Sequence, residues 1–385
     1  MKVPKIRFKG FEGDWEERKL GELCTWISEK YWNRNDLEVF SVNNKTGFIL
    51  QTEHFDNNEI ASKDKSNYKI VTKKQFAYNP SRINVWSIAY LKNEDAVIVS
   101  PLYNIFECKK ELNEMFLERF MKTFLFNKQR ILNTEVSVRE CLSFEGYCKI
   151  KIIKPETKEQ EKIWSLFEQI DSHISKNQQK LEKLKNMKQS FLQKLFPKDW
   201  SALPELRFKG FEGDWEERKL GELAEWFEYW LNAPATTFDW NNKYIRITDI
   251  DETSNLFLQT DITSPNCNLI QADKYKLSYW DILFARTWAS VWKSYMYLNS
   301  DGLVYYAWFL IKASVKEKKN TKFIFLNTLT EKYKKYIKIT SQRSWQPWVN
   351  AIEYSLYKFM TTSVPEQEKI WAFFEKLDTQ ITKQT

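Results

Sequence analysis

Residues 7–23 read RFKGFEGDWEERKLGEL, and residues 207–223 repeat that stretch without a single change. A looser repeat closes each half of the chain, with QEKIW at residues 160–164 and again at residues 367–371. Internal repeats determine the architecture before any local pattern does, and so long a period indicates duplicated domains rather than a solenoid of short units. The sequence therefore predicts two tandem copies of one plan.

The composition is that of a globular protein with a moderate excess of positive charge. The 385 residues are 43% hydrophobic and 29% charged, and the formal net charge is +8. This length allows two or three cores, and the basic balance favours a polyanionic partner such as nucleic acid. Neither a run of about eighteen apolar residues nor a secretory signal is visible, so we expect a cytoplasmic protein.

Metal ligands and disulfides are not expected. The five cysteines are scattered without a CxxC pair, and the chain has only two histidines. This pattern is typical of reduced thiols in a cytosolic protein, and it predicts no metal site. Because the chain also lacks a nucleotide-binding motif, we expect it to bind no cofactor itself.

Each half of the chain mixes short β-rich runs with helical pieces. Branched and aromatic residues favour strands at residues 39–42, 95–99, 244–247 and 281–285. One-sided apolar spacing predicts a helix over residues 114–130, and residues 15–23 are typical of a short helix.

A long helix is predicted between residues 155 and 195. Its apolar residues follow alternating steps of four and three over about five heptads, as in a coiled coil. The seam consists of Ile163, Phe167, Ile170, Ile174, Leu181, Leu184, Phe191 and Leu195, with Asn177 and Lys188 at the two polar positions. A shorter helix with matching spacing begins near Glu366, and we expect it to pack antiparallel on the first.

Motifs of common active sites are absent from the sequence. It contains no GxGxxG, P-loop, GxSxG or HExxH pattern. Residues 79–82 weakly resemble the Asn-Pro-Pro-aromatic motif of amino-methyltransferases but lack the aromatic that stacks on a flipped base. We predict no catalytic residue. A stand-alone DNA adenine methyltransferase and a coiled-coil adaptor that does not bind DNA remain open as alternatives to a DNA-binding module.

Three polar clusters are candidate DNA-reading loops. Arginine pairs with guanine, asparagine and glutamine pair with adenine, and lysine and hydroxyl groups suit phosphates. Each cluster alone is also compatible with an ordinary polar loop, but a duplicated basic chain favours DNA contact. The candidates are Asn79, Ser81, Arg82 and Asn84 in the first half, and Arg286, Thr287, Ser290, Lys293, Gln342, Arg343 and Gln346 in the second.

Tryptophan is unusually frequent and glycine unusually rare, with 17 and 9 residues. Trp240, Trp280, Trp345 and Trp348 stand where turns are expected, although turns often need a residue that accepts positive φ. One hypothesis is that most of these tryptophans are glycines, encoded by a reassigned UGA codon. The alternative is an aromatic-rich binding surface. Trp15, Trp200 and Trp215 differ, because each follows an aspartate in a repeated or amphipathic setting.

Taken in order, these pieces resemble the specificity subunit of a type I restriction-modification system. Residues 15–22 and 215–222 are similar to the opening of each target-recognition domain in that family. The runs Pro155-Glu156 with residues 160–163, and residues 365–370, are similar to the start of its conserved helices. The family has glycine where this chain has Trp86, Trp288, Trp292 and Trp371, and its distal helix is longer than residues 364–385.

The resemblance implies an α+β fold in which long helices, forming an antiparallel coiled coil, join two β-rich mixed target-recognition domains. The expected parts are target-recognition domain 1 (1–153), a central helix and linker (154–200), target-recognition domain 2 (201–363) and a short distal helix (364–385). Each domain would read half of an asymmetric, bipartite double-stranded DNA site. Two modification subunits carrying S-adenosylmethionine would dock on the helices, and restriction subunits using ATP and Mg would join the complex.

Overall fold

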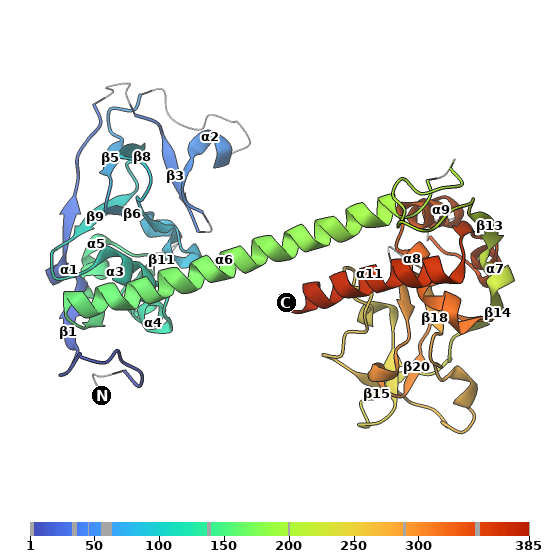
Figure 1. Cartoon of the computed structure of the whole chain (residues 1–385). Coiled ribbons are helices and arrows are strands. Elements are labelled where there is room, and N and C mark those ends of the chain that lie inside the picture. Colours follow the sequence, from blue (N-terminus) through green and yellow to red (C-terminus); the bar gives the residue numbers. More distant parts are fainter. Residues whose placement is uncertain are drawn as a thin grey trace. The chain divides into compact units, whose positions relative to one another are not determined.

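The computed structural model describes residues 4–32, 37–44, 46–54, 64–136, 140–198, 201–287, 290–342 and 347–384. The chain divides into two compact units, unit 1 (Met1–Ile174) and unit 2 (Ser175–Thr385). Each unit contains a four-stranded sheet, several two-stranded ladders and short helices (Figure 1). Within the described residues, no helix is both long enough and apolar enough to cross a membrane.

Unit 1 is built around an antiparallel sheet in the order β2 (Cys24–Ile27), β9 (Asn104–Cys108), β6 (Gln75–Tyr78) and β7 (Ile88–Tyr90). Strand β6 is buried along its whole length, which fits its apolar and aromatic residues Phe76, Ala77 and Tyr78. Four ladders complete the unit: β1 (Glu16–Lys19) with β12 (Lys151–Lys154), β3 (Phe40–Asn43) with β4 (Gly47–Leu50), β5 (Lys69–Thr72) with β8 (Ala96–Val99), and β10 (Glu135–Val136) with β11 (Glu140–Cys141).

Two helix predictions in unit 1 were wrong. The expected helix over residues 114–130 is two helices, α3 (Glu114–Met121) and α4 (Phe124–Leu132), because Thr123 leaves helical geometry and caps α4 through the N–H of Phe126. The expected helix at residues 15–23 is strand β1 followed by α1 (Leu20–Leu23), because β1 pairs with β12 along its whole length. The remaining helices are α2 (Gln51–His54) and α5 (Phe144–Lys149).

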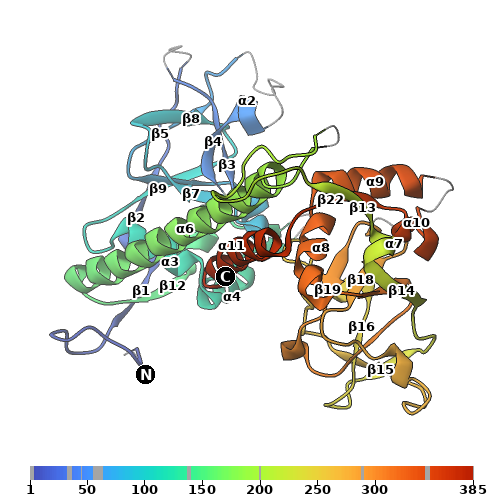
Figure 2. The same ribbon diagram turned by 45° about the vertical axis from the view of Figure 1, so that its right-hand side comes forward.

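Unit 2 repeats this plan. Its sheet has the order β14 (Ala224–Tyr229), β21 (Leu310–Val315), β18 (Ile282–Ala285) and β19 (Ser294–Met296). Ladders pair β13 (Glu216–Lys219) with β22 (Lys358–Thr361), β15 (Ala235–Thr237) with β17 (Thr263–Pro265), and β16 (Lys243–Ile245) with β20 (Val304–Tyr306). The helices are α7 (Leu220–Leu223), α8 (Thr321–Thr328), α9 (Glu331–Ser341), α10 (Ala351–Ser355) and α11 (Val364–Thr382), with α8 beside α11 (Figure 2).

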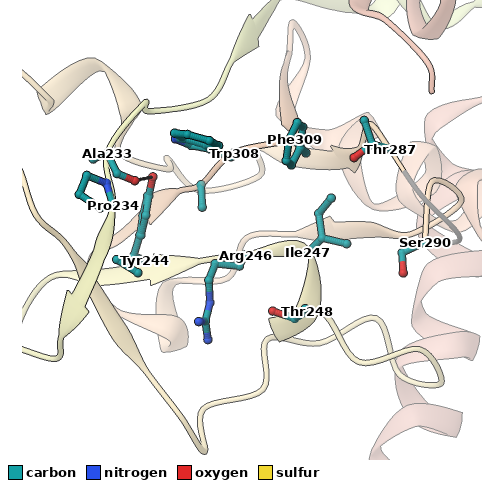
Figure 3. A pocket seen from close by; sticks show the side chains of 12 residues that line it. Ala233, Pro234, Tyr244, Arg246, Ile247, Thr248, Thr287, Ser290, Trp308 and Phe309 are labelled. Atoms are coloured by element: carbon teal, nitrogen blue, oxygen red, sulfur yellow. Dashed lines mark hydrogen bonds between the residues drawn. The ribbon is translucent and has the colours of Figure 1, made fainter. Parts of the chain in front are cut away.

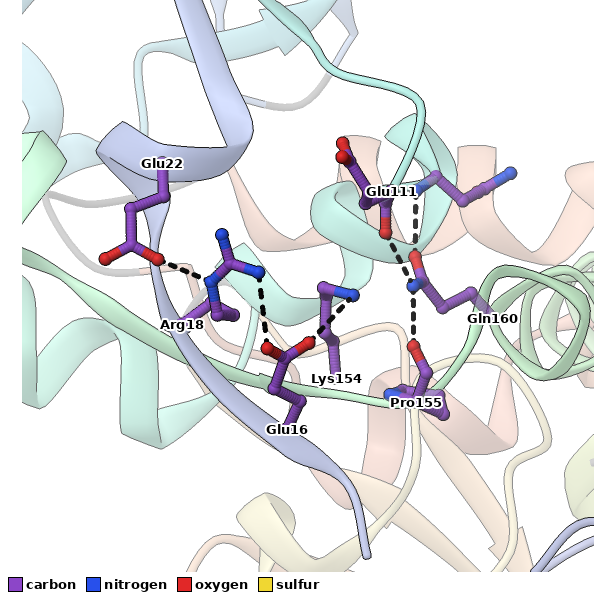
Figure 4. Close-up of polar contacts among 8 residues, drawn as sticks. Glu16, Arg18, Glu22, Glu111, Lys154, Pro155 and Gln160 are labelled. Atoms are coloured by element: carbon purple, nitrogen blue, oxygen red, sulfur yellow. Dashed lines mark hydrogen bonds and ion pairs between the residues drawn. The ribbon is translucent and has the colours of Figure 1, made fainter.

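Polar contacts fasten the start of the long helix α6 (Thr157–Lys194) to unit 1 (Figure 4). The Gln160 amide donates to the carbonyls of Pro155 and Glu111, and its oxygen accepts from the Asn113 N–H. The same view shows Arg18 bound to Glu16 and Glu22 on β1 and α1. Gln160, the first residue of the repeated QEKIW stretch, therefore fixes the start of α6 to unit 1.

The second part of α6 packs antiparallel on α11 within unit 2. The Phe191 and Phe373 ring centroids lie 4.8 Å apart, and Lys188 Nζ lies 2.6 Å from an Asp378 carboxylate oxygen. The later residue of α6 thus contacts the earlier residue of α11, as in an antiparallel pair. The expected antiparallel pairing is confirmed here, but it does not cover the whole seam. Phe167 and Ile174, in the first part of α6, remain 41% and 49% exposed.

Four tryptophans adopt the left-handed backbone conformation. Seven non-glycine residues of the described chain have positive φ, and those four are Trp32 (+57°), Trp86 (+62°), Trp240 (+69°) and Trp280 (+76°). Trp240 and Trp280 were expected at such turns. Trp348 was not correctly placed, because it pairs with Thr287 in an isolated β-bridge, and Trp345 lies outside the described residues. This clustering is unusual, since bulky side chains rarely adopt positive φ.

Candidate nucleic-acid interface

The first two polar clusters occupy equivalent places in the two units. Each follows the third strand of its four-stranded sheet: residues 79–84 follow β6, and residues 286–293 follow β18. Both strands are fully buried, so the chain leaves the core directly at the start of each cluster. Duplication therefore gives the molecule two comparable polar edges, each held by a rigid strand.

In unit 1 the first cluster forms a 3-10 helix, η1 (Pro80–Val85). The Asn79 side chain accepts a hydrogen bond from the Ser81 N–H at 3.1 Å, so Asn79 caps this turn. Ile83 is completely buried and anchors the turn in the core, whereas Ser81, Arg82 and Asn84 are exposed. The geometry thus presents a hydroxyl, a guanidinium and an amide to a ligand and gives Asn79 a structural role.

In unit 2 the Arg286 side chain is held among aromatic rings. Its guanidinium carbon lies 5.2–5.4 Å from the ring centroids of Tyr229, Trp230 and Trp348. The Arg286 Nε atom is buried and has no hydrogen-bond partner among the described residues. The three rings therefore position the guanidinium group of Arg286.

A cavity of about 570 Å³ is lined in part by Thr287, the residue that follows Arg286 in the chain (Figure 3). Thr287 and Ser290, both candidates from the sequence, line it together with Tyr244, Arg246 and Thr248. The Thr287 hydroxyl is buried without a hydrogen-bond partner in the described chain. Apolar and aromatic walls with a few hydroxyl groups are typical of ligand sites. The rest of the lining is Ala233, Pro234, Ala235, Ile247, Ala307, Trp308 and Phe309.

Internal contacts fix the polar side chains at one end of this cavity. Arg246 makes two hydrogen bonds of 2.8 Å to the Asp249 carboxylate. The single hydrogen of the Tyr244 hydroxyl is shared between the carbonyls of Leu231 and Ala233, at 2.7 and 3.0 Å, and burial raises the pKa of Tyr244 to about 12. This end of the cavity is therefore rigid.

The second and third polar clusters come together in unit 2. The Val349 N–H donates to the Arg286 carbonyl at 2.9 Å, and Thr287 pairs with Trp348 in a β-bridge. Gln342 is exposed directly after α9. Arg343 and Gln346 lie outside the described residues. Val291 and Trp292, from the second cluster, also line one cavity together with Ser341 and Gln342, so the described parts of the two clusters are neighbours.

Lys293 has an internal role that the sequence did not reveal. Its side chain is buried, with Nζ donating to the Ile250 carbonyl at 2.8 Å and lying 3.5 Å from the Glu252 carboxylate. We therefore remove Lys293 from the set of candidate DNA contacts. Sequence reasoning missed Tyr229, Arg246 and Thr248. The run at residues 244–247 signalled only a strand, and nothing local placed it opposite Thr287.

Comparison with known proteins places this geometry in a family. The family model described as "Type I restriction modification DNA specificity domain" matches twice, at residues 12–186 and 212–385. The chain belongs to this family. A search of curated proteins finds no match. Each half of the duplicated chain therefore contains one type I specificity domain. The two matched ranges begin within the two copies of the repeat, residues 7–23 and 207–223.

Solved structures show the same fold at low sequence identity. The S subunit of a type I restriction-modification system from M. genitalium is 13% identical, with a TM-score of 0.59, over 99% of this chain and 94% of that chain. A chain from a study of type I R-M complex assembly and conformational transition is 14% identical, with a TM-score of 0.55, over 99% and 93%. This specificity protein thus shares the two-domain fold over nearly its full described length.

Proposed function

We propose that this specificity protein binds double-stranded DNA at a bipartite site, with each unit reading one half, and that it catalyses no reaction itself. The observation that carries the proposal is the equivalent placement of residues 79–84 and 286–290 after the third strand of two matching sheets. Ser81, Arg82 and Asn84 would contact base edges or phosphates in one half-site. Arg286, Thr287, Ser290 and Gln342 would do so in the other.

The two units differ where they would meet DNA, although their frameworks match. Unit 1 offers a short exposed turn, η1, whereas unit 2 offers an arginine among aromatic rings, followed by Thr287 in the lining of a cavity of about 570 Å³. Different side chains at equivalent places read different bases. This difference supports an asymmetric target, with unlike half-sites. Arg343 and Gln346 remain predictions for the second half-site.

The proposed assembly follows the family. Two methyltransferase subunits that use S-adenosylmethionine would dock on this protein, and restriction subunits that use ATP and Mg would complete the complex. The chain itself would hold none of these cofactors. The exposed apolar residues of α6, including Phe167, Ile170 and Ile174, support a role for that helix in protein contacts.

Exchange of one unit tests the proposal directly. Residues 1–153 would be replaced by the corresponding unit of another type I specificity protein, and methylated adenines would be mapped in cells that express the complete system. We expect a bipartite motif in which only one half changes. A motif that is unaltered, or that changes in both halves, would refute the assignment of one half-site to each unit.

A further inference from the structure

We propose that the exposed loops at residues 8–14 and 208–214 are two identical docking elements for the same partner protein. Both loops carry the sequence FKGFEGD. They lie outside the four-stranded sheets, just before β1 and β13. Their backbone conformations also match, with φ of +90° and +75° at Gly10 and Gly13 and +92° and +79° in the second copy. We call them the braced loops.

A buried ion pair braces each loop from below. Arg7 makes two hydrogen bonds of 2.8 Å to the Glu159 carboxylate, which is completely buried at the start of α6. The remaining guanidinium N–H groups donate to the carbonyls of Gly13 and Glu12, at 2.5 and 3.1 Å. The arginine therefore holds the far side of the loop in a fixed shape, and this bidentate geometry is highly directional.

The second copy reproduces this brace with the same atoms. Arg207 bonds the buried Glu366 carboxylate at 2.7 and 2.8 Å, and it donates to the carbonyls of Gly213 and Glu212 at 2.6 and 3.1 Å. Burying a charge pair costs desolvation energy, so a buried pair is weak support for stability alone. If the ion pair serves to fix the shape of an exposed loop, its presence in both copies is explained.

Packing explains only part of the repeated sequence. Gly21 must remain glycine, because a Cβ atom there would lie 2.7 Å from the Cys148 side chain. Packing gives no such reason for Lys9, Glu12 and Asp14, because all three are exposed and their side chains form no hydrogen bond or ion pair with a described residue. The Asp14 carboxylate acts on Arg7 only as a nearby charge, which helps to raise the pKa of that arginine. Their counterparts Lys209, Glu212 and Asp214 are exposed as well. Identity at exposed positions of a rigid loop indicates recognition from outside.

The charge of the loops favours a protein over DNA. One lysine and two acidic side chains give each loop a net charge of −1, whereas the whole chain carries +8. DNA phosphates would repel such a loop, but a protein surface of complementary mixed charge would not. Because the loops are identical, they fit two copies of one partner. This inference rests on the proposed assembly, in which the partner is the methyltransferase subunit, and the fixed loop shape reduces the ordering cost of binding.

Charge reversal in one loop at a time tests the inference. The variants are Glu12→Arg with Asp14→Arg in the first loop, and Glu212→Arg with Asp214→Arg in the second. Each full-length variant would be titrated with the methyltransferase subunit of the same system and examined by native mass spectrometry. We expect the unaltered chain to bind two subunits. Each variant should bind one, with affinity at the altered copy lowered at least tenfold, and the fourfold variant should bind none.

A matched control separates loop recognition from a general charge effect. Glu94→Arg with Asp95→Arg reverses two exposed acidic residues in another turn of unit 1, and this variant should still bind two subunits. Circular dichroism would verify that every variant is folded. Two subunits bound with unchanged affinity by the fourfold variant would overturn the inference alone. An unaltered chain that binds no subunit would refute the proposed assembly as well. Loss of DNA binding with retention of both subunits would reassign the loops to DNA.

Discussion

Trp240 should tolerate glycine better than alanine, although both replacements remove the same indole ring. The residue lies in a tight turn with φ of +69°, and its side chain is 90% exposed. Asp239 closes this turn by accepting hydrogen bonds from the N–H groups of Asn241 and Asn242, at 3.0 and 2.7 Å. The backbone is therefore held in the left-handed region whichever residue occupies position 240.

The magnitude follows from comparing the two replacements. A side chain with a Cβ atom costs roughly 1–2 kcal/mol in the left-handed region. Glycine loses about 0.5–1 kcal/mol more chain entropy on folding than alanine does. From the midpoints of these ranges, the free energy of unfolding should be about 0.8 kcal/mol higher for Trp240→Gly than for Trp240→Ala. Both variants lose the same indole ring, so the free energy from burying that ring cancels when the two variants are compared.

Trp226 provides a control in which the sign reverses. It lies within strand β14 and is 52% exposed. Its backbone has no need of glycine, so Trp226→Gly should be about 0.5–1 kcal/mol less stable than Trp226→Ala. Thermal unfolding of unit 2, followed by circular dichroism, would show each difference as a shift of about 1–4 °C in Tm. If the same replacement, glycine or alanine, were the more stable one at both position 240 and position 226, the backbone argument would be refuted.

The left-handed tryptophans also make a prediction about the gene. Trp32, Trp86, Trp240 and Trp280 all have positive φ, which supports the hypothesis that a reassigned UGA codon specifies glycine at these positions. The nucleotide sequence and the mass of the protein from its native host would check this. UGG codons at all four positions, together with a mass that includes their indole rings, would contradict the hypothesis.

Three further outcomes are expected. Arg82→Ala should weaken binding to one half-site by about 1–3 kcal/mol in a fluorescence anisotropy titration if Arg82 contacts a base, whereas an equal loss on any DNA would mark a phosphate contact. Glu366→Gln should lower the free energy of unfolding by about 1–3 kcal/mol in urea, because the partly exposed Arg207 guanidinium loses a charged acceptor; a change below about 0.5 kcal/mol would contradict that role. Hydrogen bonds from Asn242 lower the pKa of Asp239 from 3.8 to about 2, so its contribution to stability is complete above pH 4 and is lost as the pH falls toward 2; Asp239→Asn should abolish this part of the acid dependence.

The sequence predicted the architecture because the repeat and the helical seam are long-range, redundant signals. It failed at short elements, where partners distant in sequence decide. Residues 16–19 appeared helical, but they form a strand because they pair with β12, more than a hundred residues later in the chain. Lys293 appeared to be a DNA contact, but the carbonyl of Ile250 holds its ammonium group inside unit 2. The contact between Arg286 and Val349 likewise depends on tertiary structure that no local pattern encodes.

Footprinting of the full-length protein on DNA that carries its methylation motif tests the central claim most directly. Two separate protected tracts are expected, one lost in Arg82→Ala and the other in Arg286→Ala, because each unit would hold its own half-site. A single continuous tract, or two tracts that weaken equally in both variants, would contradict two independent readers on one chain.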